Sequence, residues 1–398
     1  MTASEKALDR RIKQHVIAKE CVFFAVVQPG FEEVAADELR EIGVADGMRI
    51  VEGGIEFTGR LDACYRLNVC SRTATRVMMR IAEFKASNFV KLRTHACGIP
   101  WELHIKNGRS IVFSITCHHS RLYHTGRIEE ELRGAISERL ALYGLVPVFP
   151  DAAGGGDIPQ TVFIRFDNDR CHVSLDTSGE PLYRRGYKTH GVEAPLRETL
   201  AALILRAAHA ERYGMIIDPM CGSGTFAIEA AMMMRRSLPG LHRDFAFMQW
   251  PSFRPAAFQY LVRSLSGGDA VSAPLPGTVV CSDIDDSALA AARENARQAG
   301  VQDAVLPEKR DFLREKIVIP PDVKALIALN PPYGRRLSSG DTGALYRRIG
   351  ETIRGYAGCG YAIIVPALDL EKTMSLSYDR KILFMNGGIR VAVIVKNG

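Results

Sequence analysis

The stretch that decides the fold is residues 214–225, GMIIDPMCGSGT, in which a short apolar run ends in a turn containing two glycines. Two further apolar runs follow along the chain, TVVCSDID at 278–285 and ALIALNPPYG at 325–334. Sequence at helical spacing comes after the first two runs. Strands that alternate with helices form βαβ units, so the sequence predicts an α/β domain on a mostly parallel sheet, with helices on both faces.

The chain ends in RKILFMNGGIRVAVIVK (380–396), which is two strand patterns joined at Asn386 and Gly387. An Asn-Gly pair between apolar strands is a strong hairpin signal. One terminal strand should therefore run antiparallel to the rest of the sheet. Because dinucleotide-binding Rossmann sheets are generally parallel, the hairpin argues against an NAD-dependent oxidoreductase.

The first half of the chain has a different pattern, with short strands and helices in mixed order. An apolar run at 21–27 turns into helical spacing at Pro29-Gly30, residues 127–144 are amphipathic, and 161–179 holds two strand patterns around a turn. These features predict an α+β assembly ahead of the α/β domain. The predicted parts are an N-terminal extension at 1–20, a first module at 21–60, a second module at 61–180 and the α/β domain at 181–398.

The charge of the chain is concentrated in one region. Of the 398 residues, 51 are Lys or Arg and 45 are Asp or Glu, a formal net charge of +6. Residues 57–93 contain eight basic residues and two acidic ones, so the rest of the chain is balanced. An anionic partner would explain this excess, and so would an exposed helix face.

Neither a membrane segment nor a secretory signal is expected. No apolar run approaches the roughly 18 residues of a membrane span, and the first twenty residues are charged. These features predict a cytoplasmic protein with no membrane partner.

The cysteines and histidines do not suggest a metal site. The nine cysteines are widely spread and form no C-x-x-C pair, so we expect neither disulfides nor a zinc or iron–sulfur site. His118, His119 and His124 lie near Cys117, but adjacent residues on a strand point to opposite faces. Structural roles, or contacts with the anionic partner, are expected for these histidines.

Two predicted strand ends carry features suited to an adenosine-containing ligand. Gly222 and Gly224 let the backbone approach a ligand beside a helix N-terminus, although a structural tight turn would use the same glycines. The turn is not a phosphate-binding loop, because no Lys-Ser/Thr follows the second glycine. It also lacks the third glycine of the dinucleotide-binding fingerprint, but this exclusion is weaker because Ala227 at that position is also small. At the next strand end, Asp283 is placed to accept hydrogen bonds from both ribose hydroxyls.

The residues that follow extend this prediction. Asp285 or Asp286 is expected to cap the next helix, because Asp satisfies free amide groups there. Asp311 offers an acceptor for an adenine amino group, and Phe312 offers an apolar wall beside the ring. Taken alone, Asp311 would be an ordinary loop aspartate.

The most specific element is NPPYG at 330–334, directly after an apolar strand. The prolines hold the backbone extended, so the side-chain oxygen of Asn330 and the carbonyl of Pro331 can stand side by side. Together they can accept the two hydrogens of one exocyclic amine, and Tyr333 supplies a face on which a base stacks. A plain turn would explain both prolines, but not the Asn before them or the aromatic residue after them.

These motifs, in this order, resemble class I S-adenosylmethionine-dependent methyltransferases that act on exocyclic amines of bases. Upstream, QPGFEE, LNVCSRTATRVMMRIAEF, RLYHTG and LYRRGYKTHGVEAPLRETLAA resemble the ferredoxin-like, THUMP and linker regions of RNA guanine-N2 methyltransferases. That family includes the RlmL type, which acts on large-subunit ribosomal RNA, and THUMP-containing transfer RNA enzymes. The chain ends before the second methyltransferase domain that some RlmL-type proteins carry, and so resembles the stand-alone form.

The resemblance implies a ferredoxin-like part at 21–60, a THUMP RNA-binding domain at 61–180 and a class I methyltransferase domain at 181–398. It also implies S-adenosylmethionine as cofactor, S-adenosylhomocysteine as product, and no metal. The implied cofactor-binding residues are Asp218, Met220, Cys221, Gly222, Gly224, Thr225, Asp283, Ile284, Asp311 and Phe312. The implied catalytic residues are Asn330, Pro331, Pro332 and Tyr333, and the expected RNA-binding residues are Arg72, Arg76, Arg121 and Arg335.

The expected function is methyl transfer to the N2 amine of a guanine, with 23S ribosomal RNA preferred over transfer RNA as substrate. No obligate protein partner is predicted. One alternative is an adenine-N6 methyltransferase, which uses the same acceptor pair. Another is a ribosome-assembly RNA-binding protein that binds the cofactor but is catalytically idle.

Overall fold

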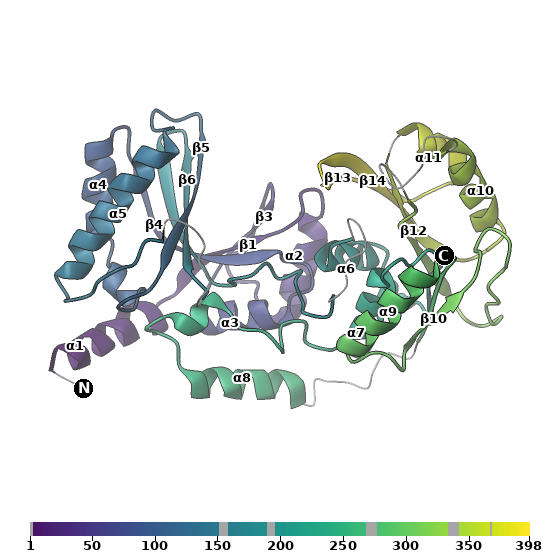
Figure 1. The fold of residues 1–398 in the computed structure, drawn as a ribbon, viewed down its shortest axis with the longest axis horizontal. Coiled ribbons are helices and arrows are strands. Elements are labelled where there is room, and N and C mark those ends of the chain that lie inside the picture. Colours follow the sequence, from purple (N-terminus) through teal and green to yellow (C-terminus); the bar gives the residue numbers. More distant parts are fainter. Residues whose placement is uncertain (1–2, 151–157, 189–195, 268–276, 333–341, 367) are drawn as a thin grey trace.

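The computed structural model describes residues 3–150, 158–188, 196–267, 277–332, 342–366 and 368–398. These residues contain two seven-stranded sheets, one in each half of the chain (Figure 1). The two halves pack against each other through a shared hydrophobic core.

The first sheet is mainly antiparallel and has the strand order β2-β3-β1-β4-β7-β6-β5. Only β5 and β6 pair in parallel. Its strands are β1 (Cys21–Val26), β2 (Arg49–Val51), β3 (Gly54–Gly59), β4 (Arg76–Lys85), β5 (Ile111–His118), β6 (Gln160–Asp167) and β7 (Arg170–Asp176). The helices of this half are α1 (Ala3–Ile12), α2 (Glu32–Ile42), α3 (Leu61–Cys70), α4 (Phe89–Gly98) and α5 (Thr125–Ala141), and α4 and α5 lie together on one face of the sheet (Figure 1).

This sheet continues across residue 60, where the sequence suggested a boundary between two modules. Strand β4 pairs with β1 on one side and with β7 on the other. The ferredoxin-like part and the part that follows it therefore share one continuous sheet.

The second sheet has the order β10-β9-β8-β11-β12-β14-β13. Its strands are β8 (Met215–Asp218), β9 (Thr278–Asp283), β10 (Val305–Lys309), β11 (Ala325–Leu329), β12 (Gly360–Val365), β13 (Arg380–Asn386) and β14 (Ile389–Lys396). The helices of this half are α6 (Glu198–Ala207), α7 (Thr225–Met234), α8 (Pro255–Gly267), α9 (Asp286–Gln298), α10 (Thr342–Arg354) and α11 (Leu368–Met374).

The strand directions confirm the predicted α/β fold. Strands β8 to β12 are parallel, β14 is antiparallel to β12, and β13 is antiparallel to β14. Only β14 therefore opposes the direction of the others. Residues of α6, α7 and α9 share a hydrophobic cluster with one face of the sheet, and residues of α10 and α11 share one with the other face.

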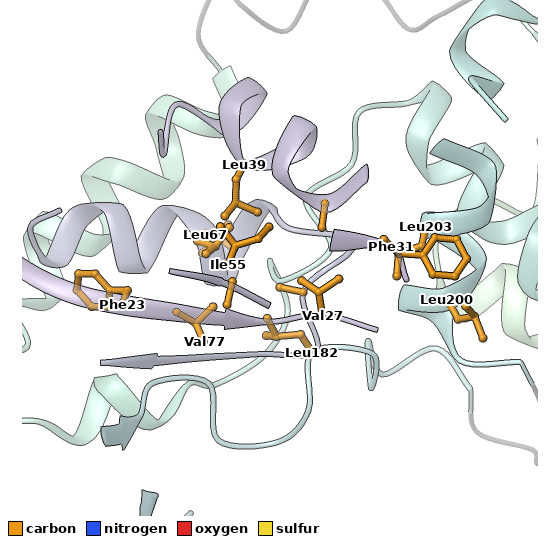
Figure 2. Packing of buried hydrophobic residues seen from close by; sticks show 14 of the residues in the cluster. Phe23, Val27, Phe31, Leu39, Ile55, Leu67, Val77, Leu182, Leu200 and Leu203 are labelled. Carbon is orange, nitrogen blue, oxygen red and sulfur yellow. The ribbon is translucent and has the colours of Figure 1, made fainter. Parts of the chain in front are cut away.

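The loop between β1 and α2 docks the first half onto the second. Phe31 is fully buried, and Figure 2 shows its ring beside Leu200 and Leu203 of α6. The ring also meets Phe384 of β13 edge to face, with 5.3 Å between centroids. Gly30 has a φ of +95°, and a Cβ there would lie 2.5 Å from the carbonyl oxygen of β13 residue Leu383. This docking therefore requires glycine at position 30.

A buried ion pair joins the halves a second time. Arg185 donates to Glu229 on α7 at 2.8 and 3.2 Å, and both side chains are at most 1% exposed. The Arg185 guanidinium also donates to the carbonyl of Arg72, and the Tyr187 hydroxyl donates to Glu229. The linker, the first half and α7 therefore meet in one network, away from solvent.

Candidate active site

The sequence motifs meet at the carboxyl edge of the second sheet. Strands β8, β9 and β11 are parallel and end at Asp218, Asp283 and Leu329, so the segments that follow them emerge on the same side. The chain passes from β8 first to β9 on one side and later to β11 on the other. In open α/β sheets, ligands bind at such a switch point, outside the carboxyl ends of the strands.

The glycine turn after β8 is fixed to the end of β9. The Cys221 amide donates to the carbonyl of Ser282 at 3.0 Å, and the Gly222 amide donates to the Asp283 carboxylate at 2.8 Å. Gly222 and Gly224 both have positive φ, of +53° and +79°. A Cβ on Gly224 would lie 3.1 Å from Ala292, whereas one on Gly222 would meet no atom of the described residues within 4 Å. Gly224 therefore serves packing, and Gly222 leaves open space beside the turn.

The remaining residues of the turn differ in exposure. Cys221 and Thr225 are 8% and 4% exposed, and Thr225 is the first residue of α7. Met220 is partly exposed. The backbone of the turn and the Met220 side chain are thus the parts that a ligand can reach.

The two aspartates of this edge have different environments. Asp218 is 1% exposed and accepts a hydrogen bond from the Ala227 amide at 3.1 Å. Burial raises the pKa of Asp218 to about 8, and the nearby charge of Asp283 adds to this rise. Asp283 is only half-buried, and its second oxygen accepts from the Asp285 amide at 3.1 Å. Backbone donors on both sides therefore orient the Asp283 carboxylate at the edge.

The cap of α9 is confirmed as Asp285, whose carboxylate accepts from the Ser287 amide at 2.9 Å. Between the two aspartates, Ile284 is 66% exposed. An apolar side chain held in solvent at this position offers a contact surface for a flat aromatic ligand.

The RDF segment after β10 was predicted only in part. Asp311 is half-buried, accepts from the Leu313 amide at 3.0 Å and lies 3.2 Å from the Arg314 guanidinium. Phe312 is 2% exposed and stacks on Tyr356 with 5.9 Å between centroids. Its ring is largely taken up by core packing, and the expectation that Phe312 walls the ligand stays a prediction. Ile284, after the neighbouring strand β9, keeps its apolar side chain exposed.

Asn330 carries a buried polar atom with no partner among the described residues. Its side-chain oxygen is buried, and no residue donates a hydrogen bond to it in the part of the chain that the structure describes. Pro331 is buried and Pro332 half-buried. Buried polar atoms are almost always paired, so an unpaired acceptor at the mouth of a site marks a place for a donor from a ligand. Tyr333 and Arg335 lie outside the described residues.

The expected RNA-binding arginines within the described residues differ in how far their charge is used inside the chain. Arg72 is 8% exposed, and its guanidinium donates to the carbonyls of Met232, at 3.0 Å, and Ser237. Burial lowers the pKa of Arg72 to about 10, so it stays charged. Arg72 thus joins the two halves, and little of its side chain is left for the expected RNA contact.

Arg76 and Arg121 differ from each other as well. Arg76 forms an ion pair with Asp176 and donates to the Gly179 carbonyl at 2.6 Å, which leaves its side chain 19% exposed. Its charge is thus used within the first half, against the expectation of an RNA contact. The Arg121 side chain is 77% exposed, and its ion pair with Asp169 is long, at 3.6 Å. It therefore remains available to a partner.

The Arg185–Glu229 pair was missed from the sequence, although a signal was present. Glu229 is the only charged residue of α7, TFAIEAAMMM, and charged side chains are rarely buried without a partner.

Among the described residues, no group of three His, Cys, Asp or Glu side chains is placed to hold a metal ion. None of the helices in these described ranges is long and apolar enough to cross a membrane.

Two family models match the chain. The model described as "RMKL-like, methyltransferase domain" matches residues 185–393, and the "RlmL ferredoxin-like domain" matches residues 22–78. The second match extends into β4, in keeping with the continuous sheet.

Curated relatives and solved structures are also similar. The ribosomal RNA large subunit methyltransferase K/L of Syntrophotalea carbinolica is 32% identical over 94% of this chain and 53% of its own length. The putative RNA methyltransferase slr0064 of Synechocystis sp. is 30% identical over 92% of this chain and 94% of its own length. The crystal structure of SMU.472, a putative methyltransferase complexed with SAH, superposes with a TM-score of 0.83, at 28% identity, over 96% of this chain and 98% of SMU.472. The chain spans about half the length of the K/L relatives that it matches.

Proposed function

Because the chain belongs to the RMKL-like methyltransferase family, we propose that it transfers a methyl group from S-adenosylmethionine to the N2 amine of a guanine in RNA. The observation that carries this proposal is the buried side-chain oxygen of Asn330, which accepts no hydrogen bond from the residues that the structure describes. It belongs to the segment that leaves β11, beside the glycine turn after β8. An amine donor would satisfy this oxygen in the reacting complex.

The residues around the glycine turn suit S-adenosylmethionine. The backbone at Gly222 leaves room for the ligand, Asp283 can accept from the ribose hydroxyls, and Ile284 can cover one face of the adenine. Asp311 stands at the next strand end, where it can accept from the adenine amino group. The methyl donor supplies an electrophilic methyl group on sulfur.

The chain's own contribution to the chemistry is the acceptor pair. The lone pair of a guanine amine is delocalised into the ring, which makes the amine a poor nucleophile. If Asn330 and the Pro331 carbonyl accept its two hydrogens, the nitrogen is held so that its lone pair faces the methyl group. Preorganised acceptors also stabilise the positive charge that grows on nitrogen, an effect worth about 10² to 10³ in rate per group in related cases. A strong general base is unnecessary, because the amine becomes acidic after transfer.

Large-subunit ribosomal RNA is the proposed substrate, with transfer RNA as the second candidate. The K/L relatives are named for ribosomal RNA and match almost the whole of this chain. The base must leave its stack, which costs a few kcal/mol and is easiest in loops. Tyr333 would stack on the displaced base. Arg121 and Arg335 would contact phosphates. They are the two expected RNA-binding arginines that remain, because Arg72 and Arg76 bind groups within the chain.

The test is a methylation assay with labelled S-adenosylmethionine. Ribosomal and transfer RNA from a strain lacking the gene are incubated separately with the protein, digested, and resolved into nucleosides. We expect label in N2-methylguanosine from 23S ribosomal RNA. Label in N6-methyladenosine would replace guanine by adenine as the target, since the acceptor pair fits both amines. No label in either RNA would leave the idle RNA-binding protein as the better description.

A further inference from the structure

The β13–β14 hairpin extends beyond the carboxyl edge of the second sheet. The pairing of β14 with β12 stops at Val365 opposite Ala392, while its pairing with β13 continues to Asn386 opposite Ile389. Three residues of each hairpin strand therefore project past the end of β12, about 10 Å at the rise of a strand. Because β13 runs parallel to β11, the hairpin tip lies on the same edge as Asn330. Three strand spacings separate the two, about 14 Å.

The projecting part and the row before it expose apolar side chains. Met385 is 51% exposed and Ile389 42%, and Leu383, in the last row beside β12, is 44% exposed. Leu383 and Met385 share one face of the hairpin, and Arg390 stands directly opposite Met385 on that face. Among the described residues no carboxylate pairs with Arg390. The tip thus presents an apolar edge with one uncompensated positive charge.

The buried face of the hairpin is held firmly. Ile382 and Phe384, on the opposite face, are 5% and 4% exposed. Phe384 packs on Phe31 of the first half, and the β13 backbone lies against Gly30. Figure 1 shows the hairpin on the side of the second sheet that faces the first half. The exposure of the tip is therefore not a consequence of a loosely attached segment.

We propose that the tip of the β13–β14 hairpin contacts the RNA beside the target nucleotide, with Met385 filling the space that the displaced base leaves in its stack and Arg390 holding a flanking phosphate. The inference rests on the proposed function, since it requires a base brought to Asn330. Proteins that unstack bases commonly insert an apolar side chain at the disrupted step, which limits the cost of unstacking. An apolar side chain next to an arginine fits a base step next to a phosphate.

The test compares Met385→Ser and Arg390→Ala with the wild type on two substrates. The first is folded 23S ribosomal RNA from the strain lacking the gene. The second is a short single-stranded RNA around the nucleotide found to be methylated. Val318→Ser is the matched control, because Val318 is 84% exposed and belongs to the segment before β11, at the opposite edge of the sheet.

We expect Met385→Ser to lower kcat/KM on folded RNA about tenfold and on the single strand less than twofold, because the single strand needs no unstacking. Arg390→Ala should raise KM on both RNAs about threefold to tenfold at low salt, and less at high salt. Val318→Ser should match the wild type, and all three variants should keep the affinity for S-adenosylmethionine and the thermal midpoint.

If Met385→Ser methylated folded RNA as fast as the wild type, the proposal would be overturned. The exposed hairpin tip would then be a candidate contact for a protein partner. An equal loss on both substrates would also overturn the proposal, because it would indicate a general defect. A wild type that methylates no RNA would instead refute the proposed function, so the two failures are distinguishable.

Discussion

Replacing Asn330 by alanine should separate catalysis from stability. The side-chain oxygen of Asn330 is buried without a donor among the described residues, so its removal breaks no hydrogen bond there. A buried unpaired polar group costs about 1–3 kcal/mol. Removing the unpaired oxygen should stabilise the fold, but the loss of side-chain packing offsets part of this gain. The free energy of unfolding of Asn330→Ala should therefore equal that of the wild type or exceed it by up to about 1 kcal/mol. Methyl transfer should fall about 10² to 10³-fold, because one preorganised acceptor of the transition state is gone.

Three measurements on the same protein preparation check this prediction. Thermal unfolding without ligand gives stability, titration with S-adenosylmethionine gives cofactor affinity, and single-turnover methylation gives the rate of transfer. The matched variant is Asn330→Asp, which keeps an oxygen acceptor at the same position. It should recover part of the lost rate, whereas a role in filling space alone would make the two variants alike.

The opposite pattern would refute the reasoning. If Asn330→Ala lost more than about 1 kcal/mol of stability, together with cofactor affinity, the residue would be holding the turn after β11. The unpaired oxygen would then be an incidental result of that turn.

Three further predictions concern the framework of the site. Gly30→Ala should lower the free energy of unfolding by at least about 2 kcal/mol, because its Cβ would meet the β13 backbone. Gly43 also has a positive φ, of +81°, but open space around it, so Gly43→Ala should lower the free energy of unfolding by only about 1 kcal/mol; denaturant unfolding measures both. Glu229→Ala should cost about 3–5 kcal/mol by leaving Arg185 buried and unpaired, and adding Arg185→Met should restore much of that in the same assay. The raised pKa of Asp218, about 8 against roughly 3.9 when unfolded, means that the folded protein binds more protons between these values. Its stability contribution should therefore decline as pH rises from about 4 to 8, by no more than about 1.4 kcal/mol per pH unit, and thermal unfolding of Asp218→Asn should lack this decline.

The second sheet could be predicted because its signals are local. The alternation of apolar runs with helical spacing specified parallel strands, and Asn386-Gly387 specified the hairpin that reverses β14. The glycine turn was predictable for the same reason, since positive φ at Gly222 and Gly224 leaves a direct trace in the sequence.

The roles of the basic residues in 57–93 could not be predicted, because their partners lie far away in the chain. Arg76 pairs with Asp176, and Arg93 pairs with Glu131 and Glu138. Part of the local excess of positive charge is thus used in ion pairs within the folded chain. Composition counts charges but does not show which carboxylates the fold brings to them.

Long-range contacts also give the first half a route to influence the proposed methyl transfer without touching the reacting atoms. Helix α7 begins at Thr225, directly after the glycine turn, and one turn later it carries Glu229, which binds Arg185 of the linker. Displacements of about 1 Å at a reacting centre can cost 100-fold in rate. A helix that is anchored at one end to the glycine turn and along its length to the buried linker cannot shift independently of either. The buried junction therefore fixes the first half relative to the glycine turn, which a flexible tether between the two halves would not achieve.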